Sequence, residues 1–270
     1  MAKPSATRTD TSAGVAAYSS IFLRLLYDYL VLGLYCRFAW RCPTHPTLTT
    51  FFNSHVPTTT TSSSTDRRQL RMLDIGVGTG YFLEQAPLSA AGISDVVLVD
   101  LNANCLARTA PRVQAAHPHV NCIPVQADFY RLDDSRLLAA SPTPSSSSSP
   151  SDDHGGDAHH HHRGFDAISA MLLLHCLPGP PARKAAALCG LRTLMDAERG
   201  VLFGATVLGD GVGHNVLGRL LMRWHNAVGI FDNKGDEATG FVEPLREAFK
   251  DVEWRVEGKM LLFEARGPIL

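Results

Sequence analysis

The sequence predicts a doubly wound α/β fold in which a mostly parallel sheet carries an antiparallel strand at the end of the chain. Three observations support this prediction. Short apolar runs alternate with stretches of helical spacing from residue 71 onward, as in a parallel sheet covered by helices. A glycine-rich turn follows the first of these runs, and only three residues separate the last two.

The predicted strands are the apolar runs, and the run at 96–100, VVLVD, is typical of a strand buried on both faces. There are seven of them, at residues 71–75, 96–100, 120–125, 165–174, 200–207, 252–256 and 260–265. Helical periods cover residues 81–87, 102–116, 181–195, 216–228 and 242–249. A parallel crossover needs about a dozen or more residues, so the last two strands must form an antiparallel hairpin.

The composition is that of a globular protein. Of the 270 residues, 45% are apolar and 19% are charged, which is enough to build a sizeable core. The 25 basic and 26 acidic side chains give a net charge of -1, so no nucleic-acid partner is predicted. The six cysteines form no CxxC pair, which favours buried thiols in a reducing, cytoplasmic compartment and no metal site.

The segment 21–40 is the most apolar stretch of the chain, but three charged side chains interrupt it. Arg24, Asp28 and Arg37 would each cost roughly 2.5–3.5 kcal/mol in lipid, so a soluble helix without stable membrane insertion is predicted. Residues 1–56 are then an N-terminal helical lid segment, and residues 66–270 are the catalytic domain. The Thr- and Ser-rich stretch 57–65 and the Ser-, Asp- and His-rich stretch 141–163 are expected to be disordered insertions.

The strongest motif is LDIGVGTG at 73–80, where Asp74 ends a strand and glycines follow at alternate positions, Gly76, Gly78 and Gly80. Such glycines permit a tight turn and let a ligand approach the backbone. The dinucleotide pattern G-x-G-x-x-G would need glycine where Tyr81 stands, and an acid beside the loop would repel a pyrophosphate. A ligand with an ammonium, a sulfonium and a carboxylate would tolerate that acid.

Acidic residues also follow the next two strands. Asp100 ends the second strand, where a carboxylate can accept hydrogen bonds from both hydroxyls of a ribose. Asp128 and Phe129 follow the third strand, where the acid can accept an adenine amino group and the ring can pack on the base. A loop cap for Asp128 and a core position for Phe129 are the alternative interpretations.

Taken together, D-x-G-x-G-x-G, the acid ending the second strand and the A-D-F after the third resemble the class I S-adenosylmethionine-dependent methyltransferases. The segments YDYLVLGLYCRFAWRCPT, LLHCLPG and GVLFGATVLG are similar to a subfamily of small bacterial and fungal methyltransferases. The resemblance implies S-adenosyl-L-methionine as the cofactor and a Rossmann-like sheet of seven strands, the last one antiparallel. It further implies that Asp74 and the three glycines line the methionine end, Asp100 holds the ribose, and Asp128 and Phe129 hold the adenine. Leu101 is also expected to bind the cofactor.

The chemistry is expected at the end of the fourth strand, where His175 would stand beside the sulfur of the cofactor. It is a candidate base for the acceptor, although a hydrogen-bonded turn histidine fits equally well. Aromatic side chains predict a pocket for a small apolar or aromatic acceptor, and packing of the lid on the core is the alternative. These side chains are Tyr27, Tyr29, Trp40, Trp224 and His225, of which Tyr27 and Tyr29 cannot both face one pocket.

Two other functions stay compatible with these motifs. A protein of this fold could bind S-adenosylmethionine and catalyse a rearrangement without methyl transfer. It could also serve as a non-enzymatic binding module, although the complete glycine loop and both acids weigh against that.

Overall fold

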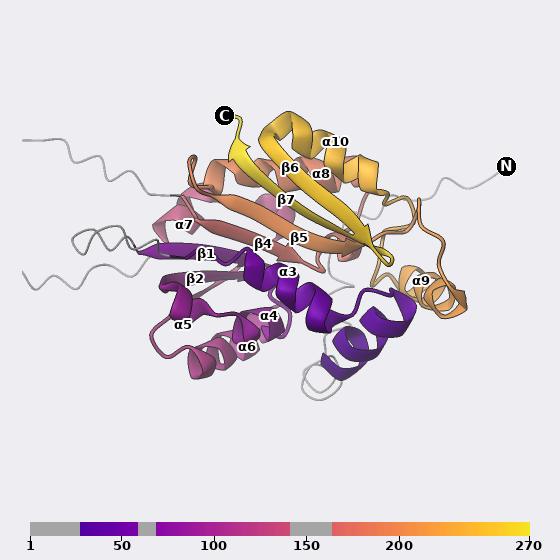
Figure 1. Ribbon diagram of the computed structural model, residues 1–270, viewed down its shortest axis with the longest axis horizontal. Helices are drawn as coiled ribbons and strands as arrows, with labels where there is room; N and C mark the ends of the chain where they lie inside the picture. The colour runs from indigo at the N-terminus through magenta and orange to yellow at the C-terminus, as the bar shows by residue number, and fades with distance from the viewer. Residues whose placement is uncertain (1–27, 59–68, 141–163) are drawn as a thin grey trace, which may run out of the picture.

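The computed structural model describes residues 28–58, 69–140 and 164–270, which form one seven-stranded sheet with helices on both faces. The strand order is β3-β2-β1-β4-β5-β7-β6 (Figure 1). β7 is antiparallel to both of its neighbours, and all other pairs are parallel. The predicted fold class is therefore confirmed. The strands are β1 (Leu70–Ile75), β2 (Ile93–Asp100), β3 (Asn121–Gln126), β4 (Ala167–Met171), β5 (Val201–Val207), β6 (Phe249–Glu257) and β7 (Met260–Pro268).

Each face of the sheet has its own buried cluster, because successive side chains of a strand point to opposite faces. Met72 and Leu73 of β1 are both fully buried but belong to different clusters. The cluster of Met72 is covered by α3 (Thr49–Ser54), α4 (Tyr81–Gln85), α5 (Leu88–Ala91) and α6 (Ala103–Ala116). The cluster of Leu73 is covered by α7 (Asp134–Ala139), α8 (Pro181–Gly190) and α10 (Ala238–Ala248).

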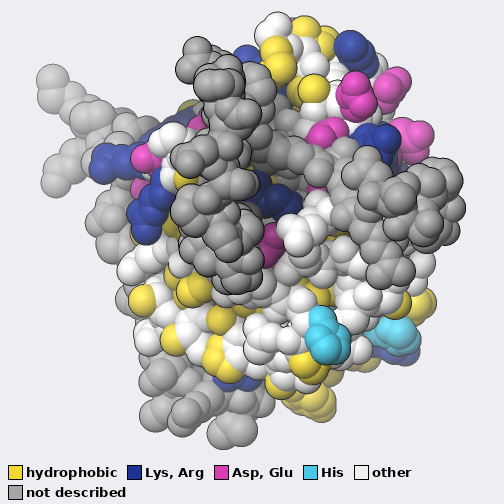
Figure 2. All heavy atoms as spheres, turned by 90° about the vertical axis from the view of Figure 1, so that its left-hand side faces the viewer, with side chains coloured by type: hydrophobic (Ala, Val, Ile, Leu, Met, Phe, Trp, Pro, Cys, Tyr) yellow, Lys and Arg dark blue, Asp and Glu magenta, His cyan; other side chains and the backbone are white. Residues whose placement is uncertain are grey.

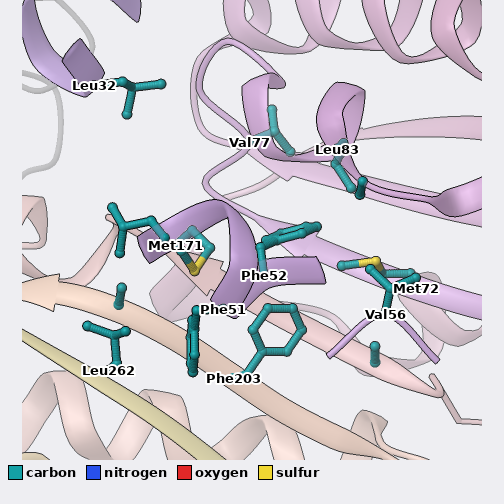
Figure 3. Close-up of a cluster of buried hydrophobic side chains, with 14 of the residues drawn as sticks. Leu32, Phe51, Phe52, Val56, Met72, Val77, Leu83, Met171, Phe203 and Leu262 are labelled. Atoms are coloured by element: carbon teal, nitrogen blue, oxygen red, sulfur yellow. The ribbon is translucent and has the colours of Figure 1, made fainter. Parts of the chain in front are cut away.

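The described part of the N-terminal segment packs on the first of these clusters. It consists of η1 (Asp28–Ala39), η2 (Thr44–Leu48) and α3. Figure 3 shows Phe51 and Phe52 of α3 among the side chains of the sheet, and the ring of Phe52 lies 5.4 Å from that of Phe203 in β5. Leu32 of η1 belongs to the same cluster. Among the described helices, none is long and apolar enough to cross a bilayer.

Several predicted boundaries shift in the structure. The fourth strand ends at Met171, because Leu172 has a φ of 56° and turns the chain into the short helix η4 (Leu174–Cys176). The helix predicted for 181–195 ends at Gly190 and continues as η5 (Leu191–Leu194). The predicted helix at 216–228 is confirmed as α9 (Val216–Val228). The two predicted insertions lie outside the described residues, apart from Pro57 and Thr58.

Charged side chains of both signs are interspersed on the side of the molecule that lies at the left in Figure 1 (Figure 2). This mixture agrees with the net charge of -1. Among the described residues of that side, no large field of one sign is visible.

Candidate functional site

The glycine loop connects β1 to α4, and each of its three glycines has a left-handed backbone with φ between 53° and 76°. The reasons for glycine differ between the positions. A Cβ on Gly76 would stand 2.9 Å from the Leu173 side chain, and one on Gly80 would stand 2.7 Å from Thr109. A Cβ on Gly78 would meet only a backbone oxygen at 4.0 Å, so the space above Gly78 is open. Gly76 and Gly80 therefore serve packing as well, and Gly78 leaves room for a ligand.

Asp100 lies at the end of β2, beside the glycine loop. Its Oδ1 accepts a hydrogen bond from the Asn102 backbone N–H at 2.8 Å, and its Oδ2 accepts one from the Gly78 N–H at 3.3 Å. Burial raises the pKa of Asp100 above its ordinary value, while these backbone N–H groups lower it. The carboxylate thus holds the loop in place and keeps further lone pairs available for a ligand.

Asp128 and Phe129 stand where the third strand ends. Asp128 caps the short helix η3 (Phe129–Arg131), because its Oδ1 accepts a hydrogen bond from the Tyr130 N–H at 3.0 Å. Phe129 is buried in the second core cluster and also faces a cavity. Both alternative interpretations, a loop cap for Asp128 and a core aromatic for Phe129, therefore describe these residues. Both side chains also line a cavity, where they can contact a ligand.

One cavity brings most of the predicted cofactor residues together at the carboxyl ends of the parallel strands. This first cavity has about 810 Å³ of space, a volume that includes the open solvent at its mouth. Six of its lining residues were predicted from the sequence: Gly76, Gly78, Asp100, Leu101, Asp128 and Phe129. The lining also includes residues that sequence reasoning missed, among them Asn102, Cys105, Met171, Leu173, Cys176 and Leu177.

The missed residues leave a partial signal in the sequence. The carboxyl ends of parallel strands lie at the same edge of a sheet, so the sequence could have predicted that the residues after β4 lie near those after β1 and β2. The left-handed turn at Leu172 then sends Leu173 and Cys176 into the cavity, and a turn of this kind is not predictable for leucine.

Asp74 and Gly80 line a smaller second cavity, which shares Gly76 and Gly78 with the first and is also lined by Leu32 of η1. Asp74 is buried, and the Ser169 hydroxyl of β4 donates a hydrogen bond to its Oδ1. Burial raises the pKa of Asp74 to about 7 against the effect of Ser169, and the negative charge of Asp100 adds to the rise. A pKa of this value means that the carboxyl group changes its charge close to neutral pH.

A polar cluster joins η1 to the glycine loop, and sequence reasoning missed it. Arg112 of α6 donates to Asp28 Oδ2 at 2.7 Å, to the Thr79 carbonyl at 3.0 Å and to Glu84 at 2.6 Å. The Thr79 hydroxyl donates to Asp28 Oδ1 at 2.5 Å. Asp28, one of the charges that argued against a membrane span, thus fixes the N-terminal segment beside the second cavity.

His175 belongs to the lining of neither cavity. Its Nδ1 accepts a hydrogen bond from the Val207 backbone N–H at 3.3 Å, which places the ring proton on Nε2. Burial, together with smaller effects of Lys184 and His225, lowers the pKa of His175 to about 3. With its Nδ1 lone pair engaged by a backbone N–H, His175 has the geometry of the hydrogen-bonded turn histidine, and its role as a base stays a prediction.

The predicted acceptor residues are not gathered in one pocket. Tyr27 lies outside the described residues, and Tyr29 is 68% exposed. Trp40 is buried in the core against His214 and Phe231. Neither Trp40, Trp224 nor His225 lines either cavity.

The orientation of α9 explains where two of these residues point. Its buried face consists of Gly218, Met222 and His225, so Trp224 is turned outward and is half exposed. The His225 ring stacks on Phe231 at 4.6 Å, and its Nδ1 lies 2.7 Å from the Leu221 carbonyl oxygen. A carbonyl only accepts, so this Nδ1 carries a proton and Nε2 has the free lone pair.

The described residues contain no group of three His, Cys, Asp or Glu side chains arranged to hold a metal ion. All six cysteines lie in the described part of the chain and are free thiols. The run of four histidines at 159–162 lies outside it.

The chain is similar to several fungal proteins over almost its whole length. It is 36% identical to methyltransferase verB of Penicillium polonicum, covering 93% of this chain and 96% of that protein. It is 35% identical to O-methyltransferase NEC2 of Pyricularia oryzae, with coverage of 95% and 93%. It is 32% identical to the physcion biosynthesis cluster O-methyltransferase of Aspergillus chevalieri, with coverage of 97% and 98%. No family model matches the chain.

Among solved structures, the fold is similar to that of an O-methyltransferase family protein from Burkholderia thailandensis. The TM-score is 0.50 at 14% identity, over 81% of this chain and 56% of that protein, so this chain spans little more than half of it. A similar score of 0.54 at 14% identity relates it to a protein of Bordetella parapertussis, covering 82% of this chain and 66% of that one. At these identities the likeness shows the fold alone.

Proposed function

Because the chain belongs to the S-adenosylmethionine-dependent methyltransferases, we propose that it methylates a hydroxyl oxygen of a small apolar or aromatic molecule. The support for oxygen as the acceptor atom is that several relatives are named O-methyltransferases. The observation that carries the proposal is the first cavity, where a glycine loop and two acids from three successive strand ends face one space.

The residues of the first cavity fit the cofactor. Gly78 leaves open space above the backbone, and Asp100 offers a carboxylate for the two ribose hydroxyls. Asp128 and Phe129 offer an acceptor for the adenine amino group and an apolar surface for the base. Asp74, in the neighbouring second cavity, offers a negative charge to the methionine ammonium. When bound, the cofactor supplies a methyl group already activated by its sulfonium.

With such a cofactor, the protein has to align the acceptor oxygen, exclude water and accept the hydroxyl proton. The apolar side chains of Met171, Leu173 and Leu177 exclude water from one side of the first cavity. Leu32 does the same above the second cavity, where the Asp28–Arg112 ion pair holds η1.

The experiment for this proposal is an incubation of the purified protein with S-adenosylmethionine and a series of phenols. The expected result is one adenosylhomocysteine per methyl ether formed, measured by mass spectrometry. Cofactor binding with turnover of an acceptor that gains no methyl group would instead indicate a rearrangement. Absence of any saturable binding of adenosylhomocysteine in a calorimeter would contradict the proposal altogether.

The affinity for S-adenosylmethionine is expected to rise by up to about tenfold between pH 6 and pH 8. With a pKa of about 7, Asp74 is mostly protonated at the lower pH and mostly ionised at the higher one, and only the ionised form attracts a cation. Calorimetric titrations at both pH values measure the effect. The cofactor's own amino group also titrates, so Asp74→Asn is the control, and its affinity should lack the rise due to Asp74. The same pH slope in both proteins would exclude this role for Asp74.

His175→Asn is expected to keep turnover within about tenfold of the wild type, whereas His175→Ala should lose more. Asparagine places Oδ1 near the position of Nδ1 and can still accept the Val207 N–H, so it preserves the positioning role. Loss of a general base would instead slow both variants about 10²–10⁴-fold. Turnover as a function of pH separates the cases, because only a base would give the wild type a titration step that both variants lack.

A further inference from the structure

The outward face of α9 is apolar although it has no partner among the described residues. We call the α9 face the five side chains Val216, Leu217, Leu220, Trp224 and Val228, whose exposed fractions range from 42% to 74%. They share one side of the helix, because Gly218, Met222 and His225 occupy the opposite, buried side. Figure 1 shows α9 at the rim of the molecule, beyond the end of the sheet.

The surroundings of the α9 face are basic. Between residues 211 and 231 the sequence contains no Asp or Glu, while Arg219 and Arg223 lie exposed on α9 itself. The face continues onto η1, since the Asn215 side chain donates to the Phe38 carbonyl at 2.7 Å and the Phe38 ring is 53% exposed. The Arg37 guanidinium lies 5.8 Å from the centre of that ring. Trp and Leu on one side with arginines at the flank are typical of a helix that lies in a membrane interface.

We propose that the α9 face docks on an anionic lipid surface, with Leu220 and Trp224 entering the interface and Arg219 and Arg223 meeting the headgroups. The binding is peripheral and reversible, since it uses one face of a 13-residue helix.

Charge disfavours two alternative occupants. A second copy of the chain in a two-fold contact would set this basic patch against the same patch of the other copy. Residues 1–27 of this chain carry Lys3, Arg8 and Arg24 against the single acid Asp10, so their net charge has the same sign as the face. A lipid surface has the opposite sign and, being fluid, needs no preformed groove for a convex helix.

Docking through the α9 face would also bring the second cavity close to the lipid surface. α9 contacts η1 through the His225 and Tyr35 rings, and Leu32 of η1 lines the second cavity. An apolar acceptor dissolved in the bilayer would therefore meet the protein on this corner, a consequence that rests on the proposed function.

Sedimentation with vesicles tests the docking without any measurement of activity. The probes are vesicles of phosphatidylcholine alone and of phosphatidylcholine mixed with phosphatidylserine. The wild type should bind the mixed vesicles more tightly than the phosphatidylcholine vesicles. The double variant Arg219→Gln with Arg223→Gln should lower the affinity for mixed vesicles by about fivefold per arginine and leave binding to phosphatidylcholine vesicles unchanged. Leu220→Ser with Trp224→Ser should weaken binding at least about tenfold, because two apolar side chains no longer leave water.

Trp254→Ser is the matched control, since Trp254 is the other exposed tryptophan, 40% exposed on β6, and its loss should leave vesicle binding unchanged. In a Trp254→Phe background, mixed vesicles should shift the Trp224 fluorescence to shorter wavelength, because the remaining Trp40 is buried. Circular dichroism checks that each variant is folded, and Leu217→Ser provides a second variant of the face.

Three results would overturn the proposal. They are equal binding of wild type and face variants to mixed vesicles, binding of a soluble polyanion such as heparin without binding of vesicles, and a dimer in sedimentation velocity that the face variants dissociate. The last result would assign the face to a second copy of the chain.

Discussion

Replacing Lys184 with alanine is expected to lower the free energy of unfolding by about 3–5 kcal/mol, because it leaves a buried carboxylate without its counter-charge. Lys184 of α8 and Asp236 are both fully buried. The Lys184 Nζ donates to the two oxygens of Asp236 at 3.0 and 2.7 Å and to the Asp232 carbonyl at 2.6 Å. Urea unfolding followed by circular dichroism measures the loss.

The destabilisation of this variant should be smaller at pH 5.5 than at pH 8. Burial raises the pKa of Asp236 to about 6 even though Lys184 lowers it, and removal of the lysine lets it rise further. A carboxyl group whose pKa is higher in the folded than in the unfolded state stabilises the folded state as the pH falls, so acid restores part of the loss.

Two further variants separate the ion pair from the general loss of a lysine. Lys250→Ala removes an exposed lysine and should change the stability by less than about 0.5 kcal/mol. Lys184→Met with Asp236→Leu removes both charges and should be more stable than Lys184→Ala alone. A loss below about 1 kcal/mol in Lys184→Ala at pH 8 would show that water reaches the pair.

The same ion pair bears on the site, because it holds the segment that ends at Asp236 against the exit of β4. The Asp232 N–H donates to the His175 carbonyl at 3.0 Å, and the Gly179 N–H donates to Asp232 Oδ2 at 2.8 Å. Lys184→Ala should therefore also loosen the wall of the first cavity formed by Cys176 and Leu177.

Asp100→Ala is expected to weaken S-adenosylmethionine binding by about 1.5–3 kcal/mol, or about 10- to 150-fold. The variant removes the proposed acceptor of the ribose hydroxyls. It also removes the acceptor of the Gly78 and Asn102 N–H groups, which shape the glycine loop. Isothermal titration calorimetry with S-adenosylmethionine measures the affinity.

Asp133→Ala is the matched control for this prediction. Asp133 is also an aspartate that accepts a backbone N–H, here from Arg136 at the start of α7, but it does not line the first cavity. Its loss should cost helix stability and leave the cofactor affinity unchanged. Asp100→Asn, which keeps one acceptor oxygen, should fall between the wild type and Asp100→Ala. An unchanged affinity in Asp100→Ala would show that the ribose binds elsewhere.

The sequence predicted the positions of some site residues and not of others. Gly76 and Gly78 of the glycine loop and the acids at 100 and 128 line one cavity. They come together because each motif directly follows an apolar run, and the carboxyl ends of parallel strands share one edge of the sheet. By contrast, Trp40 and Trp224 were assigned to a pocket from residue type alone, and one is in the core and the other in solvent.

By itself, the sequence determined the order of strands and helices, the reversal at the closing hairpin and the chemical character of the loop after β1. These features depend on residues that are close together in the sequence, because hydrophobic periodicity and turn-forming residues act over a few positions. Only the tertiary structure decided which charges pair, as with Asp28 and Arg112 or Lys184 and Asp236, and which nitrogen of His175 carries the proton. Such properties depend on how far each helix is rotated about its axis and on what is buried around each side chain. Both are set by packing between segments about 30 or more residues apart.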